Sequence, residues 1–228
     1  LDVLDVNDAN LDPVFERLDL FERSVIVCKS PHGSGKTNAL VPRIEKYVKQ
    51  RYGLETVRTL YICSLRSVIR QTTSNLMMAC YITPDGKIDD LVIEEADRIG
   101  ICIKSLAKVE ANDAYDVVII DESEQVAMWS DWENQTHNML IDVCKHAKVA
   151  LLMDADAADL SMYMASEISR EGEHELSVLF NLKSYIASQK AFLLQYEVDF
   201  YGKIIDLLDE GKSLWINVDF DDKNSNPR

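Results

Sequence analysis

The sequence of 228 residues lacks any apolar run near the roughly 18 residues that a membrane-spanning helix requires. Its first residues are acidic, and they contain neither the basic segment nor the apolar core of a secretory signal peptide. We therefore expect a protein without a membrane partner. The chain starts with Leu rather than Met, and we interpret it as part of a longer protein.

The sequence also lacks paired cysteines and an excess of positive charge. None of the five cysteines forms a CxxC pair, and four lie in or beside apolar runs, which is typical of buried, reduced thiols in a cytoplasmic protein. The 24 basic residues are outnumbered by 39 acidic residues, for a net charge of −15. This balance argues against nucleic-acid binding through the whole surface, because phosphate neutralisation needs clustered Lys and Arg. Binding through a local basic strip stays open.

What the sequence does contain is an alternation of short apolar strands with amphipathic helices. Strands are expected at 24–28, 56–63, 100–104, 116–120 and 149–153. Helices are expected at 36–51, 66–78 and 132–146. Near-continuous apolar strands that alternate with helices are typical of a parallel sheet covered on both faces. The predicted fold class is therefore α/β.

The chain is expected to divide into four parts. Residues 1–23 are an N-terminal extension, 24–165 the main α/β domain, 166–190 a linker and 191–228 the truncated beginning of a second domain. The linker is assigned because the strand–helix alternation weakens there. In the last part, a strand at 192–195, a helix at 199–210 and a strand at 212–218 are predicted.

The sharpest motif follows the first expected strand. It reads SPHGSGKT, and it departs from the Walker A pattern GxxxxGK[ST] where Ser30 replaces the first Gly. Glycines let backbone N–H groups turn toward a phosphate, and the positive end of the helix dipole strengthens the attraction. Lys36 is expected to reach the β- and γ-phosphates, and Thr37 to coordinate Mg²⁺. The alternative, a fortuitous Gly-Ser turn, is disfavoured by the strand before the loop and the helix after it. The predicted loop consists of Ser30, Pro31, His32, Gly33, Ser34, Gly35, Lys36 and Thr37.

A second motif, DVVIIDE, ends another apolar strand with Asp121 and Glu122. In a parallel sheet, the carboxyl ends of the strands lie at the same edge as the phosphate loop. Asp121 is therefore predicted to hold Mg²⁺ as the Walker B residue, and Glu122 to orient or deprotonate the attacking water. The two acids could instead cap the following helix. With Lys36 as the catalytic cation, they favour a motor-type or switch-type NTPase over a small-molecule kinase.

The two motifs together resemble the first RecA-like domain of superfamily 2 helicases. Further segments match family motifs in the same order: TLYICSLRSVIRQ motif Ia, CIKSL motif Ib, LLMDADA motif III and EGKSLWINVDF motif IV. Within this family, the sequence is most similar to origin-of-replication-binding helicases of the herpesvirus type and to related phage and plasmid replication proteins.

This resemblance implies roles for further residues. Ser64 and Arg66 in motif Ia, and Ser105 in motif Ib, would contact nucleic acid, although a solvated helix face is the alternative for the arginine. Asp154 and Asp156 stand where many helicases have Ser-Ala-Thr. They would couple the chemistry at the nucleotide to the second domain or to nucleic acid. Alternatively, they would cap a helix that begins near residue 157.

Two tryptophans follow the acidic motif. Trp129 and Trp132 could stack on bases, although packing between helices is the commoner role of a tryptophan. The histidines His137, His146 and His174 do not have the spacing of metal ligands.

The resemblance also implies the ligands and the activity. ATP and Mg²⁺ would bind the loop, and DNA, single-stranded or an origin duplex, would follow a local basic strip. A second RecA-like domain would supply the arginine finger, so that this chain alone should hydrolyse ATP weakly. We expect the ATP-binding domain of a DNA helicase or translocase in viral, phage or plasmid replication, located in the cytoplasm or, if viral, in the host nucleus or cytoplasm. Two alternatives stay open: an AAA-type ATPase initiator or loader, and a non-catalytic P-loop binding module.

Overall fold

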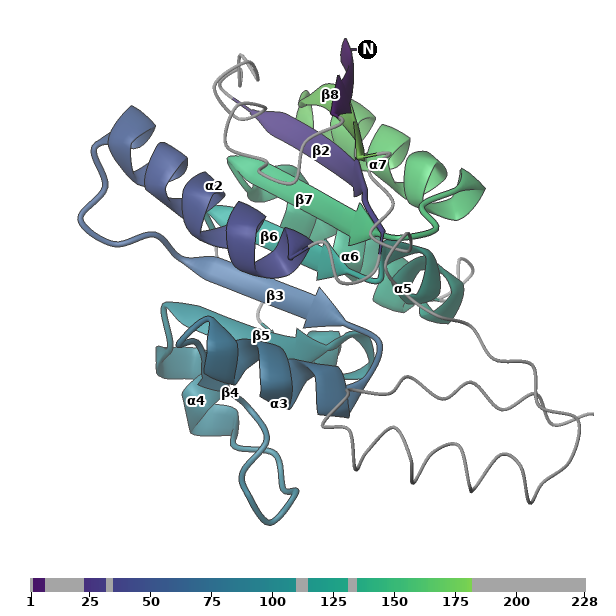
Figure 1. The fold of residues 1–228 in the computed structure, drawn as a ribbon. Helices are drawn as coiled ribbons and strands as arrows, with labels where there is room; N and C mark the ends of the chain where they lie inside the picture. The colour runs from purple at the N-terminus through teal and green to yellow at the C-terminus, as the bar shows by residue number, and fades with distance from the viewer. Residues whose placement is uncertain (1, 7–22, 32–34, 110–114, 131–134, 182–228) are drawn as a thin grey trace, which may run out of the picture. The chain divides into compact units, whose positions relative to one another are not determined.

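A single parallel sheet with helices on both faces is the framework of the described part of the chain (Figure 1). The computed structural model describes residues 2–6, 23–31, 35–109, 115–130 and 135–181. The eight strands lie in the order β1-β8-β2-β7-β6-β3-β5-β4, and every neighbouring pair is parallel. Their bounds are β1 Asp2–Val6, β2 Ser24–Lys29, β3 Thr59–Cys63, β4 Ala79–Cys80, β5 Arg98–Cys102, β6 Val117–Asp121, β7 Val149–Asp154 and β8 Glu175–Asn181.

Helices cover both faces of this sheet. The helices are α2 Lys36–Tyr52, α3 Arg66–Asn75, α4 Asp90–Glu95, the 3-10 helix η1 Ile103–Lys108, α5 Ser123–Trp129, α6 Gln135–His146 and α7 Asp159–Gly172. Figure 1 shows α2 and α3 on one face, with α5, α6 and α7 on the other. None of the helices in the described ranges is long and apolar enough to cross a bilayer.

The hydrophobic core runs along the middle strands. Every residue of β3, β6 and β7 is buried, because helices exclude water from both faces of the sheet. Helix α2 packs on this layer through Leu40, Val41, Ile44 and Val48, which recur at helical spacing and are fully buried. The helix ends at Gly53, whose φ of 64° lies in the left-handed region that glycine adopts without strain.

The predicted α/β class is confirmed, and all five predicted strands of the main domain are present. The strand predicted at 56–63 starts later, at Thr59, and the one predicted at 100–104 lies two residues earlier. The helix predicted at 132–146 is described from Gln135 onward, and a separate helix, α5, precedes it. All five cysteines are free thiols, and four of them are buried, which agrees with the prediction of buried, reduced thiols; the four are Cys28, Cys63, Cys102 and Cys144.

The predicted linker at 166–190 is wrong over its first half. Residues up to Gly172 belong to α7, whose Met164, Ala165 and Ile168 are buried at helical spacing. Strand β8 then enters the same sheet between β1 and β2, so that residues 166–181 complete the first domain. The N-terminal extension likewise contributes β1 to this sheet. The strands and the helix predicted in 191–228 lie outside the described residues.

Candidate functional site

The phosphate-loop motif lies where β2 leads into α2, at the carboxyl edge of the sheet. Gly35 precedes the helix with a φ of 74°, and open space surrounds the position of a Cβ there, so it is the backbone conformation that favours glycine. Ser30 is fully buried and Pro31 is half-buried. His32, Gly33 and Ser34 lie outside the described residues.

Lys36 and Thr37 occupy the first turn of α2, where helix N–H groups have no partner within the helix. Lys36 is 7% exposed, which is unusual for a lysine and keeps most of its side chain out of bulk water. The Thr37 hydroxyl donates a hydrogen bond to Oδ2 of Asp121, at 3.1 Å. The two predicted Mg²⁺ ligands therefore come together, although 84 residues separate them in the chain.

Asp121 ends β6 and is 5% exposed. A buried carboxylate next to a hydroxyl is an oxygen-rich setting, which suits Mg²⁺. Lys36 brings a positive charge and Asp121 a negative charge to this part of the edge. Both charges act on the thiol of Cys28 in β2. Burial raises the pKa of this thiol to about 12. The charge of Lys36 lowers the pKa, and the charge of Asp121 raises it. The thiol therefore stays neutral, and the two opposite charges lie close to it.

Tyr61 is a site residue that the sequence analysis missed. Its ring is fully buried in β3, and its hydroxyl donates to Oδ2 of Asp121 at 2.6 Å. Burial, together with the negative charge of Asp121, raises the pKa of Tyr61, so the phenol remains a neutral donor. In the sequence, this tyrosine is one more apolar strand residue. Its role depends on β3 being the neighbour of β6.

Glu122 follows Asp121 at the start of α5 with φ 53° and ψ 53°, a left-handed conformation that is strained for a residue other than glycine. The chain turns there directly from β6 into α5, and Asp121 Oδ1 accepts the Glu122 N–H at 3.1 Å. Glu122 occupies the position that caps α5, but its side chain makes no capping hydrogen bond to that helix. The turn thus places Glu122 directly after Asp121 at the carboxyl edge of the sheet.

Glu124 is a second residue that the sequence analysis missed. Its carboxylate accepts the N–H groups of Ala158, Leu160 and Ser161, and the Ser161 hydroxyl, at 2.7 to 3.2 Å. Burial raises the pKa of Glu124, but these hydrogen bonds together outweigh it and lower the pKa below its usual value. Glu124 is therefore the cap of α7, and it joins the acidic motif to the segment after β7.

Asp154 and Asp156 do not cap α7, which corrects one of the two predicted roles. Asp154 is 4% exposed, and its two oxygens accept the N–H groups of Glu124 at 2.8 Å and of Asp156 at 2.9 Å. Its backbone oxygen accepts the N–H of Ser30 at 3.0 Å, which ties the end of β7 to the phosphate loop. Asp156 is exposed at the same edge.

The three predicted nucleic-acid contacts have different surroundings. Arg66 is exposed at the start of α3, and the Ser64 hydroxyl donates to Gln125 Oε1 at 3.0 Å. Ser105 is 6% exposed, and its hydroxyl bonds the Tyr81 hydroxyl at 3.1 Å inside the domain. The predicted contact of Ser105 with nucleic acid is therefore wrong, because η1 turns this side chain toward the interior of the domain.

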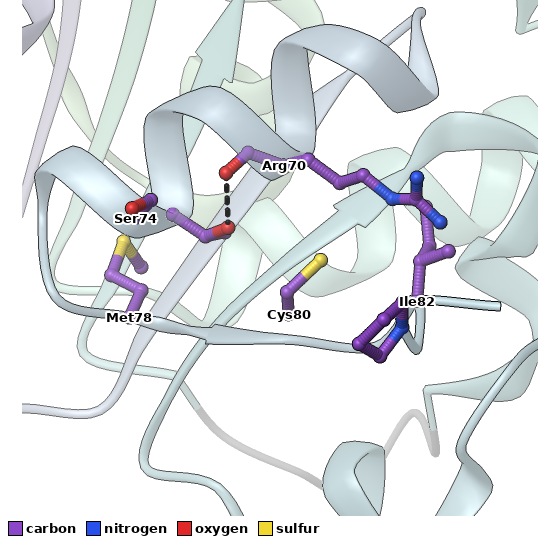
Figure 2. Close-up of a pocket in the computed structure, with 7 residues that line it drawn as sticks. Arg70, Ser74, Met78, Cys80 and Ile82 are labelled. Atoms are coloured by element: carbon purple, nitrogen blue, oxygen red, sulfur yellow. Dashed lines mark hydrogen bonds between the residues drawn. The ribbon is translucent and has the colours of Figure 1, made fainter. Parts of the chain in front are cut away.

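Arg70, one turn after Arg66, faces a different part of the molecule. Its guanidinium donates to the Thr83 carbonyl at 2.9 Å and borders a hollow of about 480 Å³, lined also by Ser74, Met78 and Cys80 (Figure 2). This hollow lies along the second half of α3, away from the carboxyl edge where the nucleotide motifs meet. Arg70 is therefore not part of that edge.

The model of the family described as "Origin of replication binding protein" matches residues 13–181. No curated protein matches the chain.

Several solved structures have the same fold. The helicase domain of Hef from Pyrococcus furiosus has a TM-score of 0.54 at 12% identity, with 89% of this chain and 45% of that chain covered. Mss116p bound to ssRNA and AMP-PNP gives 0.53 at 15% identity, with 81% and 48% covered. A DEAD box protein from Methanococcus jannaschii gives 0.51 at 14%, with 86% and 54% covered. The chain thus spans about half the length of these proteins, and the likeness establishes a RecA-like helicase fold.

Proposed function

The chain belongs to the family of origin of replication binding proteins, and we propose that it is the ATP-binding domain of an ATP-dependent DNA helicase or translocase in replication. The observation that carries this proposal is the contact between Thr37 and Asp121, 3.1 Å apart, at the sheet edge where Lys36 and Glu122 also lie. This is the combination of hydroxyl, carboxylate, cation and second acid that phosphoryl transfer to water requires.

In this proposal, the start of α2 binds the phosphates of ATP. Backbone N–H groups of the loop and the Lys36 ammonium neutralise phosphate charge, and Thr37 and Asp121 hold Mg²⁺. The metal, when bound, neutralises charge that develops on the phosphate oxygens. Glu122 orients a water molecule for attack and takes its proton.

Specific features favour the helicase hypothesis over the two alternatives, a non-catalytic P-loop binding module and an AAA-type ATPase. A degenerate binding module need not retain Lys36, Thr37, Asp121 and Glu122 together. An AAA-type ATPase normally has a polar sensor, Asn or Thr, after the strand that here ends with Asp154. The RecA-like helicase fold supports a motor that closes on ATP against a second domain, in which Asp154 and Asp156 couple the two sites. Arg66 and Ser64 would then contact the DNA strand.

The test is ATP hydrolysis by a protein that extends beyond residue 228 and carries the second domain, with and without single-stranded DNA. We expect DNA to accelerate hydrolysis. Glu122→Gln should retain nucleotide binding and lose about 100-fold or more in hydrolysis rate, because it removes a general base. Absence of stimulation by any DNA or RNA would contradict the helicase proposal. Unchanged hydrolysis in Glu122→Gln would contradict the proposed role of this residue.

A further inference from the structure

Trp129 is an exposed aromatic residue with a cation on its ring. It is the last residue of α5, and 52% of its surface is exposed. The Lys104 ammonium, from η1, lies 3.9 Å from the centre of the indole ring. Packing between helices therefore accounts for only part of this tryptophan, since half of its surface faces solvent.

Helix α5, which ends with Trp129, also contacts Ser64, one of the residues that were predicted to contact nucleic acid. Helix η1 directly follows β5, and α5 directly follows β6, so both begin at the carboxyl edge of the sheet. One helical turn before Trp129, Gln125 accepts the Ser64 hydroxyl. The Ser64 carbonyl is also within 3.1 Å of the Cys102 sulfur, at the end of β5. We call the set Ser64, Arg66, Lys104, Gln125 and Trp129 the Trp129 surface.

The charge of this surface is opposite to that of the chain. The net charge is −15, and several cations elsewhere in the domain pair with acids, as in Lys108–Asp90 and Arg98–Glu45. Among the described residues, neither Arg66 nor Lys104 forms an ion pair with a carboxylate, and both are exposed. A cation over an accessible indole ring, together with a second exposed cation two residues after Ser64, matches the phosphates and bases of a single nucleic-acid strand.

We propose that Trp129 stacks on a base of a single nucleic-acid strand while Lys104 and Arg66 contact its phosphates. This inference rests on the proposed function and adds to it the residue that contacts a base. In this proposal, helix α5 connects the nucleotide site with the nucleic-acid site. Glu122 precedes its N-terminus on the nucleotide side, and Trp129 is its last residue, on the side of the nucleic-acid strand. A helix of seven residues is short enough to move as a unit when the nucleotide site closes.

The test compares strands with and without bases. Binding of fluorescent oligo(dT) and of an abasic oligonucleotide of the same length is measured by anisotropy for the wild-type chain, Trp129→Ala, Trp129→Phe and Lys104→Ala. Trp129→Ala should weaken oligo(dT) binding about tenfold, since stacking of one base is worth about 1–3 kcal/mol, and should leave the abasic strand unaffected. Trp129→Phe keeps a ring and should retain most of the affinity. Met128→Ala, a neighbouring exposed residue without a ring, is the matched control and should bind as the wild type does.

Lys104→Ala should weaken both strands and reduce the slope of log K against log salt by about 0.7, the value for one contact to a single strand. Lys49→Ala, an exposed lysine in the last turn of α2 at the opposite edge of the sheet, should leave the slope unchanged. If Trp129→Ala lost the same affinity for the abasic oligonucleotide as for oligo(dT), or lost affinity for neither, the inference would be overturned while the helicase proposal stands. If the wild type bound no strand, both would fail.

Discussion

The phenol oxygen of Tyr61 lies 2.6 Å from Oδ2 of Asp121, the same carboxylate oxygen that accepts the Thr37 hydroxyl at 3.1 Å. Strand β3, strand β6 and helix α2 therefore meet at one atom. Because Tyr61 is buried and its ring is fixed by the core, the carboxylate is oriented before any ligand binds. Pre-orientation of this kind lowers the cost of ordering a metal ligand.

Tyr61→Phe removes this hydrogen bond and keeps the ring. We expect the Mg²⁺ concentration needed for half-maximal nucleotide binding to rise about tenfold or more, because a hydrogen bond to a charged group contributes about 1.5–3 kcal/mol. The measurement is a Mg²⁺ titration at constant fluorescent nucleotide. Tyr81→Phe, which removes another buried tyrosine hydroxyl away from the site, is the control. The same Mg²⁺ dependence in Tyr61→Phe and the wild type would show that Tyr61 is structural alone.

Glu124→Gln should destabilise the domain at neutral pH. The amide has one acceptor oxygen in place of two, so N–H groups of α7 lose a partner, at a cost of about 1–3 kcal/mol. The pKa of Glu124 is lowered in the folded state, so its stabilising effect is complete above the usual glutamate pKa of about 4.3 and is lost as the pH falls through the lowered value. Urea unfolding at several pH values should show the difference from the wild type shrinking below about pH 4.3. A constant difference down to pH 3 would contradict the capping role.

The buried contact between Gly172 and His174 provides a prediction about stability. A Cβ on Gly172 would lie 2.2 Å from Nδ1 of His174 and 2.9 Å from the backbone of Lys145. The imidazole cannot move freely, because its Nε2 lies 2.9 Å from the Ala147 carbonyl. Gly172→Ala should therefore lower the unfolding free energy by about 1–3 kcal/mol, measured by urea unfolding. An unchanged midpoint would show that this corner repacks without cost.

His174 itself should make stability depend on pH. Burial lowers the pKa of His174, so the unfolded chain binds a proton more readily than the folded chain. Stability should accordingly fall as the pH drops below about 6.5 toward the lowered value. His174→Gln, which keeps a donor for the Ala147 carbonyl, should remove this fall between pH 7 and 5.5. The same fall in the variant would assign it to another group.

The strands at the centre of the sheet could be predicted from sequence, because helices on both faces make β2, β3, β6 and β7 almost continuously apolar between their ends. A helix near residue 157 was predicted only as an alternative, and the extent of α7 was missed because charged residues interrupt its apolar positions, although Met164 and Ile168 are one turn apart. Strand β8 was missed with it, since a strand next to the edge strand β1 carries polar residues such as Ser177.

The residues of the site also divide into those that the sequence predicts and those that depend on tertiary packing. Thr37, Asp121 and Glu122 could be placed together because their motif fixes the local turn and the parallel sheet fixes the edge. Tyr61 and Glu124 could not, because their partners depend on which strands are neighbours and on where α7 begins. A hydroxyl or carboxylate finds its partner through tertiary packing, which periodicity does not encode. Ser105 was misplaced for the same reason.

The central claim is that the start of α2 and the end of β6 form a Mg²⁺-nucleotide site. Its most direct test is calorimetric titration of Mg·ATPγS into the chain, beside Lys36→Ala and the control Lys46→Ala, an exposed lysine of the same helix. We predict micromolar binding that Lys46→Ala retains and Lys36→Ala weakens at least tenfold. Absence of binding by the wild-type chain, or equal binding by Lys36→Ala, would contradict the account.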